Sequence, residues 1–336
     1  MSLEVFDSKN NCFVSPLSIY CSLSLAMSGS SGRSHHEVAQ VLNVHKQQFK
    51  DYDSTLTHLG SRLDSVFAGD TGESLVNRFF NKALEKHFHA ESHMVNFASN
   101  AEEARKQINV WVSDHTCKKI PDLMTQNSID SRTRLVLGNA IYFKGGLSPR
   151  SNNGLPFPSP YDGEVQVPMM SNNGVYEMSR FDEFSATTLK IPFKLSIHEM
   201  LIVLPDTDVL ELMEKIFDPY HFSHFKELFD KSKYESNRVE LHLPKFKLGG
   251  GERQNVKKPL SAMGLETIFN HLASPKRKSC TSRVNEAGAE AAAATGMAVT
   301  PMCMCSEFTV DHPFLFFIVT ETGVPAFMGH VINPLA

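Results

Sequence analysis

The sequence predicts an α+β fold in a single domain that spans residues 1–336. Strand-length apolar runs and helical patterns follow each other in mixed order, without the regular alternation of a parallel βαβ sheet. Of the residues, 41% are hydrophobic and 21% charged, and a chain of this length buries roughly three quarters of its extended surface. No linker of useful length and no internal repeat interrupts the chain, so we expect one domain.

Helical patterns dominate the first third of the chain. Residues 15–28 are predicted to form a helix because Ser15 can cap it and Pro16 fits its first turn. The same start argues against the alternative that the apolar run 17–26 is the core of a signal peptide. Further helices are expected at 34–42, 49–66 and 101–118, the last with the only tryptophan, Trp111, on its inner side.

Strand patterns dominate the rest of the sequence. Residues 134–143 are almost continuously apolar, as in a strand covered on both faces. Residues 145–160 are rich in Gly, Ser, Asn and Pro, which predicts an irregular connection. Other strands are expected at 77–84, 188–192, 199–204, 238–243, 308–310, 314–320 and 326–331, and helices at 210–216, 221–229 and 258–263.

Charge and hydropathy exclude several classes of partner. The formal net charge is -4, whereas a nucleic-acid-binding domain normally concentrates basic residues on one face. Basic clusters at 118–119, 257–258 and 276–278 are interpreted as solvated surface, with weak binding of a polyanion such as heparin as the alternative. No segment reaches the roughly 20 apolar residues of a membrane span, so no membrane contact is expected.

The cysteines and the absence of glycosylation signals bear on the compartment. Six cysteines are scattered through a chain large enough to be stable without disulfides, so we expect thiols. The chain has no Asn-x-Ser/Thr sequon, which favours a protein that does not pass through the secretory route. We therefore expect a protein that is cytoplasmic or released without a recognisable signal peptide. A monomer is also expected.

No catalytic or metal-binding motif is complete. The sequence HEVAQ at 36–40 begins like a zinc protease helix, but Gln40 stands where the second histidine is needed. The serines in 29–32 lack the spacing of a nucleophile elbow, and the glycines at 249–251 are not followed by the Lys-Ser/Thr of a phosphate loop. Cys303 and Cys305 could bind a metal or sense an oxidant, but a third ligand is missing. We expect no enzymatic activity, no cofactor and no metal.

The stretch NEAGAEAAAATGMAVTPMCMCSEFTVDHP, residues 285–313, can be interpreted in two ways. With a period of two, Ala289, Ala291 and Ala293 lie on one small, apolar face that could enter a sheet. Its composition instead favours an alanine helix, because alanine is the best helix former and a poor strand former. From the residues alone both interpretations remain open.

The order of elements in this stretch resembles the hinge and reactive-centre loop of the serpins, the serine protease inhibitor family, and favours the extended interpretation. The resemblance covers nearly the whole chain and is most similar to the intracellular ovalbumin-like branch. Besides the loop, four blocks carry it in the family's order: FVSPLSI at 13–19, LGNAIYFKG at 137–145, LHLPKF at 241–246 and GHVINP at 329–334. It implies the serpin fold, with mixed β-sheets, surrounding helices and an exposed reactive-centre loop at about 286–311. It also implies that the helix at 101–118 crosses the sheet that accepts the loop.

The resemblance further implies a suicide substrate for a serine protease, which cleaves the loop and is trapped in a covalent complex as the loop enters the large sheet. Family spacing places the cut between Met302 and Cys303, fourteen residues after Gly288 and eleven before Pro313. An unbranched, uncharged Met302 suits an elastase-like or chymotrypsin-like pocket. The protease subsites would take Val299, Thr300, Pro301 and Met304. The hinge comprises Glu286, Gly288, Ala289, Glu290, Ala291, Ala292, Ala293, Ala294 and Thr295.

The polar cluster where the central strands of a serpin part is matched by Ser15, Ser18 and Asn139. Three positions depart from the family: Lys278 replaces a histidine of this cluster, Leu147 a tryptophan, and Ala287 stands where an acidic residue is common. These departures fall on parts that gate insertion, so the alternative is a non-inhibitory serpin that acts as a carrier, storage protein or chaperone. The unobstructed alanine hinge favours the inhibitor.

Overall fold

The computed structural model describes residues 10–28, 30, 32–44, 95–115, 118, 122–126, 128–131, 136, 150–159, 163–193, 198–218, 222–248, 257–267, 282–284 and 306–335. They belong to two compact units, which are described one at a time. The first unit comprises Met1–Val5, Ser15–Tyr142 and Arg253–Cys280, and the second comprises Phe6–Val14, Phe143–Glu252 and Thr281–Ala336. The expectation of a single domain stays a prediction.

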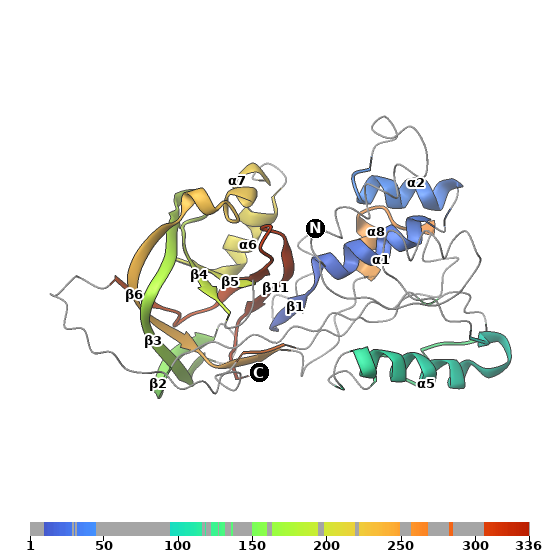
Figure 1. The fold of residues 1–336 in the computed structure, drawn as a ribbon, viewed down its shortest axis with the longest axis horizontal. Coiled ribbons are helices and arrows are strands. Elements are labelled where there is room, and N and C mark those ends of the chain that lie inside the picture. The colour runs from blue at the N-terminus through green and yellow to red at the C-terminus, as the bar shows by residue number, and fades with distance from the viewer. Residues whose placement is uncertain are drawn as a thin grey trace. The chain divides into compact units, whose positions relative to one another are not determined.

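The described part of the first unit is helical (Figure 1), with α1 at Pro16–Ser28, α2 at Gly32–Val41, α5 at Phe97–His115 and α8 at Lys257–Ala262. Ser15 caps α1 as predicted, because its Oγ accepts a hydrogen bond from the Ser18 amide at 3.0 Å. The contacts between α1, α2 and α8 form one apolar cluster, in which Met27, Val38 and Leu265 are fully buried.

Helix α5 begins four residues earlier than predicted. Its backbone leaves helical geometry at Asn100, where φ is −147° and ψ 63°, so the helix has a short first segment before a kink. Trp111 packs beside Val112 and Leu123, in agreement with the prediction that it faces inward.

The second unit is built on a nine-stranded sheet with the order β1-β11-β10-β5-β4-β3-β6-β9, while β2 pairs with β3. The pairs are antiparallel except β6–β9, which is parallel. Figure 1 shows β3 and β6 curving side by side. The strands are β1 (Cys12–Val14), β2 (Arg150–Ser159), β3 (Gly163–Phe181), β4 (Ala186–Pro192), β5 (Glu199–Pro205), β6 (Glu235–Pro244), β9 (Ser306–Thr309), β10 (Phe314–Val319) and β11 (Pro325–Val331).

The remaining elements of this unit are short. A separate two-stranded sheet pairs β7 (Phe246–Leu248) with β8 (Ser282–Val284). The helices are α6 (Val209–Phe217) and α7 (Phe222–Glu227), with 3-10 turns η2 (Asp182–Phe184) and η4 (Lys231–Lys233). Helix α6 is capped by Asp208, whose carboxylate accepts from the Leu210 amide at 2.8 Å, and its buried residues recur with helical spacing.

Strand β10 is the centre of this unit's core, because each of its residues is buried. The Phe316 ring packs 5.9 Å from Phe13 of β1, while the Phe317 ring meets Phe229, after α7, edge-on at 5.3 Å. Both faces of the strand are therefore covered, as its continuous apolar sequence predicts.

The prediction of an irregular connection at 145–160 is wrong for residues 150–159, which form β2. Pro156 and Pro158 suggested a loop, but β2 pairs only with β3 among the described strands, and proline is tolerated on such an edge. The fully buried Phe157 holds the strand against the core. The other strands and helices predicted from residue 188 onward are confirmed, with boundary shifts of a few residues.

The predicted elements at 49–66, 77–84 and most of 134–143 lie outside the described residues. Cys12 and Cys21, the two cysteines within the described ranges, are buried thiols. No helix among the described residues is long and apolar enough to cross a membrane.

Candidate functional site

The candidate site is the region where the chain enters and leaves the predicted reactive loop. On the entry side, β8 pairs antiparallel with β7, with Val284 opposite Phe246. On the exit side, β9 begins at Ser306 and pairs in parallel with β6 of the larger sheet. The strands before and after residues 285–305 therefore belong to different sheets.

Strand β9 is held on one side by β6, with Phe308 opposite Leu241 and both side chains buried. The pairing extends one step past the strand, because the Val310 amide donates to the His242 carbonyl at 2.8 Å. Val310 is fully buried. The exit of the loop is thus fixed by backbone hydrogen bonds and by two buried apolar side chains.

The other face of β6 and β9 is polar. Glu240 lies opposite Glu307, so two carboxylates are placed at cross-strand positions, an arrangement that destabilises a strand pair. Each has a local partner: the Thr309 hydroxyl donates to Glu307 at 2.8 Å, and His242 Nε2 lies 3.5 Å from Glu240. His242 Nδ1 in turn lies 2.8 Å from the Ser171 hydroxyl on β3.

After β9, the turn at Asp311, His312 and Pro313 leads directly into β10. His312 contacts the Asp311 carboxylate and the carbonyl of Pro205, the last residue of β5. Beside it, Arg180 forms a two-pronged ion pair with Asp206, with Nη1 2.6 Å from Oδ1. The guanidinium of Arg180 holds the pKa of Asp206 below its ordinary value.

In the first unit, the predicted sheet-opening residues Ser15 and Ser18 are both buried, with 3% of their surface exposed. Their backbone and side chains form the first turn of α1, and the Ser18 carbonyl accepts from the Ser22 hydroxyl at 2.9 Å. The structure therefore places these two predicted residues together at the start of α1.

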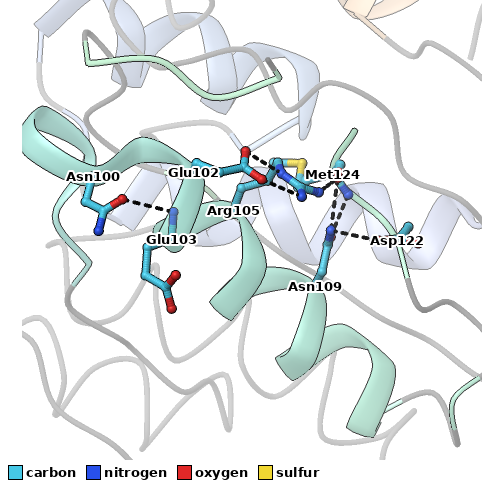
Figure 2. Close-up of polar contacts among 7 residues, drawn as sticks. All are labelled: Asn100, Glu102, Glu103, Arg105, Asn109, Asp122 and Met124. Atoms are coloured by element: carbon cyan, nitrogen blue, oxygen red, sulfur yellow. Dashed lines mark hydrogen bonds and ion pairs between the residues drawn. The ribbon is translucent and has the colours of Figure 1, made fainter. Parts of the chain in front are cut away.

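A second polar cluster ties α5 to the segment that follows it (Figure 2). The Asn109 amide pairs with the Met124 backbone, accepting from its N–H at 2.7 Å and donating to its carbonyl at 2.9 Å. Arg105 Nη1 donates to the same carbonyl at 2.7 Å. Glu102 orients Arg105 through two contacts of 2.7 and 2.8 Å, and the hydrogen bond from Arg105 lowers the pKa of Glu102. The cluster fixes a backbone turn by side-chain hydrogen bonds.

The sequence predictions did not include this cluster. Glu102, Arg105 and Asn109 recur at steps of three and four along the helix, so one face of α5 carries all three. Asn109 and Met124 are both buried. This spacing could have indicated a polar face on α5. It could not have indicated the partner, because the Met124 groups are backbone groups and every residue has them.

The remaining predicted site residues lie outside the described residues. They are the reactive bond at Met302 and Cys303, the subsite residues Val299, Thr300, Pro301 and Met304, the hinge between Glu286 and Thr295, and Asn139 and Lys278. Their roles stay predictions. Among the described residues, no group of three His, Cys, Asp or Glu side chains is arranged to hold a metal ion.

Comparisons with known proteins establish the family. The family model described as "Serpin (serine protease inhibitor)" matches residues 2–334. Iris of Ixodes ricinus is 32% identical over 97% of this chain and 93% of its own length. The leukocyte elastase inhibitor of Xenopus tropicalis is 30% identical over 96% of this chain and 93% of its own length. The chain belongs to the serpin family.

A solved structure agrees on the fold. Uncleaved ovalbumin matches with a TM-score of 0.79 and 22% identity, and the match covers 99% of this chain and 95% of that one. At this identity the likeness concerns the fold alone. The recognition of the family and the prediction of the serpin fold are confirmed.

The expectation about enzymatic activity needs a correction in its basis. It rested on the absence of complete catalytic motifs. The family match supplies a better basis. The family is described as serine protease inhibitors, and inhibitors of this family are not catalysts.

Proposed function

We propose that this protein inhibits a serine protease of the elastase-like or chymotrypsin-like kind, as a suicide substrate cleaved between Met302 and Cys303. The observation that carries the proposal is that β8 and β9, on either side of residues 285–305, belong to different sheets. A segment anchored at both ends in separate sheets can be bound by a protease as an extended peptide. The leukocyte elastase inhibitor among the relatives supports the choice of protease.

The covalent step follows the chemistry of serine proteases. The protease serine attacks the carbonyl carbon of Met302 and gives its proton to the protease histidine, which passes it to the nitrogen of Cys303 as the peptide bond breaks. The products are an ester between the protease and Met302 and a new amino terminus at Cys303. Water would normally hydrolyse this ester, so inhibition requires a faster competing event.

The competing event in this proposal is insertion of the cut hinge into a sheet as a new strand, which is the way serpin loops insert in general. Each new backbone hydrogen bond contributes about 0.5–1.5 kcal/mol, while ordering each residue costs about 1–2 kcal/mol, so hydrogen bonds alone cannot drive the insertion. The inward side chains must therefore enter without obstruction. Ala289, Ala291 and Ala293 meet this requirement.

The test is incubation of the purified chain with chymotrypsin-like, elastase-like and trypsin-like proteases, followed by denaturing electrophoresis. A covalent complex with the first two, and none with the third, is the expected result. Cleavage at residues 302–303 without a complex would favour the carrier, storage or chaperone alternative. A complex with trypsin alone would contradict the assignment of Met302.

Two further features are proposed with this function. We infer that the inhibitor acts as a monomer, because the trap involves one loop and one protease. The absence of Asn-x-Ser/Thr sequons supports the proposal that the protein is cytoplasmic or released without a recognisable signal peptide. Size-exclusion chromatography with light scattering and fractionation of the source cells test these points.

A further inference from the structure

The side chain of His312 connects two elements that meet at the exit of the loop. Its Nδ1 lies 2.7 Å from Oδ1 of Asp311, and its Nε2 lies 2.6 Å from the carbonyl oxygen of Pro205, at the end of β5. Both distances lie at or just below the short end of the range of roughly 2.7–3.2 Å for N–H···O hydrogen bonds. The ring thus spans the turn before β10 and the last residue of the neighbouring strand.

Both of these partners are hydrogen-bond acceptors. An ionised carboxylate and a backbone carbonyl have no proton to donate, whereas a neutral imidazole has one N–H and one bare nitrogen. A neutral ring would therefore direct a lone pair at one of the two oxygens. Only the doubly protonated ring satisfies both contacts.

The charges around His312 favour a cation at this place. Asp311 lies on its own turn, and Asp206 directly follows Pro205 at the end of β5. The charge of His312 contributes to the low pKa of Asp206, after the larger effect of Arg180. The positive charge nearest to these groups from β3 is that of Arg180, which would repel a charged His312. Arg180 forms ion pairs with Asp206 and with Asp182 of η2. Asp182 pairs with Arg180, so this group of side chains holds three carboxylates and one permanent cation, and a charged His312 brings it closer to neutrality.

We propose that His312 works in its doubly protonated form as a proton-dependent tie, which fastens the turn 311–313 to the end of β5. Loss of one ring proton breaks one of the two contacts. The turn follows β9 directly, and β9 pairs with β6 alone among the described strands. The tie therefore stabilises the point at which the loop rejoins the larger sheet, and its stabilisation decreases as pH rises. The proposal does not depend on inhibitory activity.

The protonation state can be measured directly on the intact wild-type protein. In NMR spectra of protein with 15N-labelled histidine, His312, assigned by comparison with His312→Gln, is expected to show two protonated ring nitrogens while the fold is intact at about pH 6.5, where free histidine is half neutral. A ring with a single protonated nitrogen at that pH would overturn the proposal. This measurement requires no variant to be as stable as the wild type.

A matched pair of variants tests the consequence. In Asp311→Asn the amide N–H can donate to a bare Nδ1 while Nε2–H donates to Pro205, so a neutral ring also satisfies both contacts. In His312→Gln the titrating group is absent. When pH is raised from about 6 to about 9, across the range in which histidines lose their charge, the Val310 amide of the wild type should lose about tenfold in exchange protection, corrected for the intrinsic rate. Both variants should keep theirs unchanged. An equal loss in all three proteins would reject the tie.

Discussion

Asn109 and Met124 form two hydrogen bonds with each other, one to each polar group of the Met124 backbone. An asparagine side chain has the same donor and acceptor pair as a peptide bond, so here it takes the place of a neighbouring strand. Both residues are buried, and the pair joins α5 to a segment fifteen residues further along the chain.

We therefore expect Asn109→Ala to destabilise the first unit. The variant leaves the Met124 N–H buried without its partner, at a cost of about 1–3 kcal/mol, while Arg105 still binds the carbonyl. Urea unfolding measures the change. The control is Val110→Ala on the same helix, where 60% of the valine surface is exposed. If both variants unfold at the same urea concentration, the pair contributes nothing to stability.

Glu37 is expected to make the first unit sensitive to acid. Its carboxylate accepts from the Thr267 hydroxyl at 2.6 Å and from the amides of Thr267 and Glu266 at 2.8 and 3.1 Å. These bonds, that from the Thr267 hydroxyl first, lower the pKa of Glu37 below the ordinary 4.5. The folded state thus binds this proton less readily than the unfolded state. The stabilisation is complete above pH 4.5 and is lost as pH falls through the lower folded-state pKa.

Glu37→Gln should accordingly lower the melting temperature at neutral pH, and the difference from the wild type should shrink in acid. Glu266→Gln is the control. The Glu266 side chain is 68% exposed, and its ion pair with Arg33 is long, at 3.7 Å, so it should contribute little to stability. Scanning calorimetry across this pH range measures both. A difference between wild type and Glu37→Gln that is independent of pH would show that the charge has no role.

Met302→Arg should redirect the inhibitor to trypsin-like proteases. A cationic side chain pairs with the acidic primary pocket of those enzymes, and an apolar pocket rejects it. The rate of complex formation should rise with trypsin and fall by at least about tenfold with elastase-like and chymotrypsin-like enzymes, as followed by residual protease activity. An unchanged order of preference would place the cleaved bond elsewhere.

Ala289→Arg should convert the inhibitor into a substrate. The proposed insertion brings Ala289 to the inward face, where burying an arginine without a partner is costly. The expected result on gels is cleaved chain with little covalent complex, and a cleaved form no more heat-stable than the intact one. Ala292→Arg, on the opposite face of the extended hinge, should keep complex formation. Equal complex yields from both variants would contradict the assigned faces.

The sequence predicted best those strands whose burial is visible in their composition. Strand β10 is an unbroken apolar run, and its neighbours on both faces explain why. Strand β3 was missed because its middle, with Asn172, Asn173 and Gly174, has the composition of a turn. It is a strand because Asn172 pairs with Leu241 and Gly174 with Val239 of β6, and these tertiary contacts override local preference.

The same limit applies to the candidate site. The resemblance to the serpins predicted the loop, which lies outside the described residues and stays a prediction, and Ser15 was predicted as a helix cap from its neighbour Pro16. The contacts of His312 were not predictable, because the Pro205 carbonyl is 107 residues away and is a backbone group. Hydrogen bonds to a distant backbone leave no residue-type pattern, and they become visible only when the fold places them.

The length of β9 has a consequence for how molecules of this protein meet one another. Among the described strands β9 lies at an end of the sheet order and has four residues, and a short edge strand offers little unpaired backbone to a second chain. Its exposed Glu307 adds a negative charge that an identical molecule would also carry. The short length of β9 and the repulsion between the Glu307 side chains of two molecules should both disfavour pairing between β9 strands of different molecules.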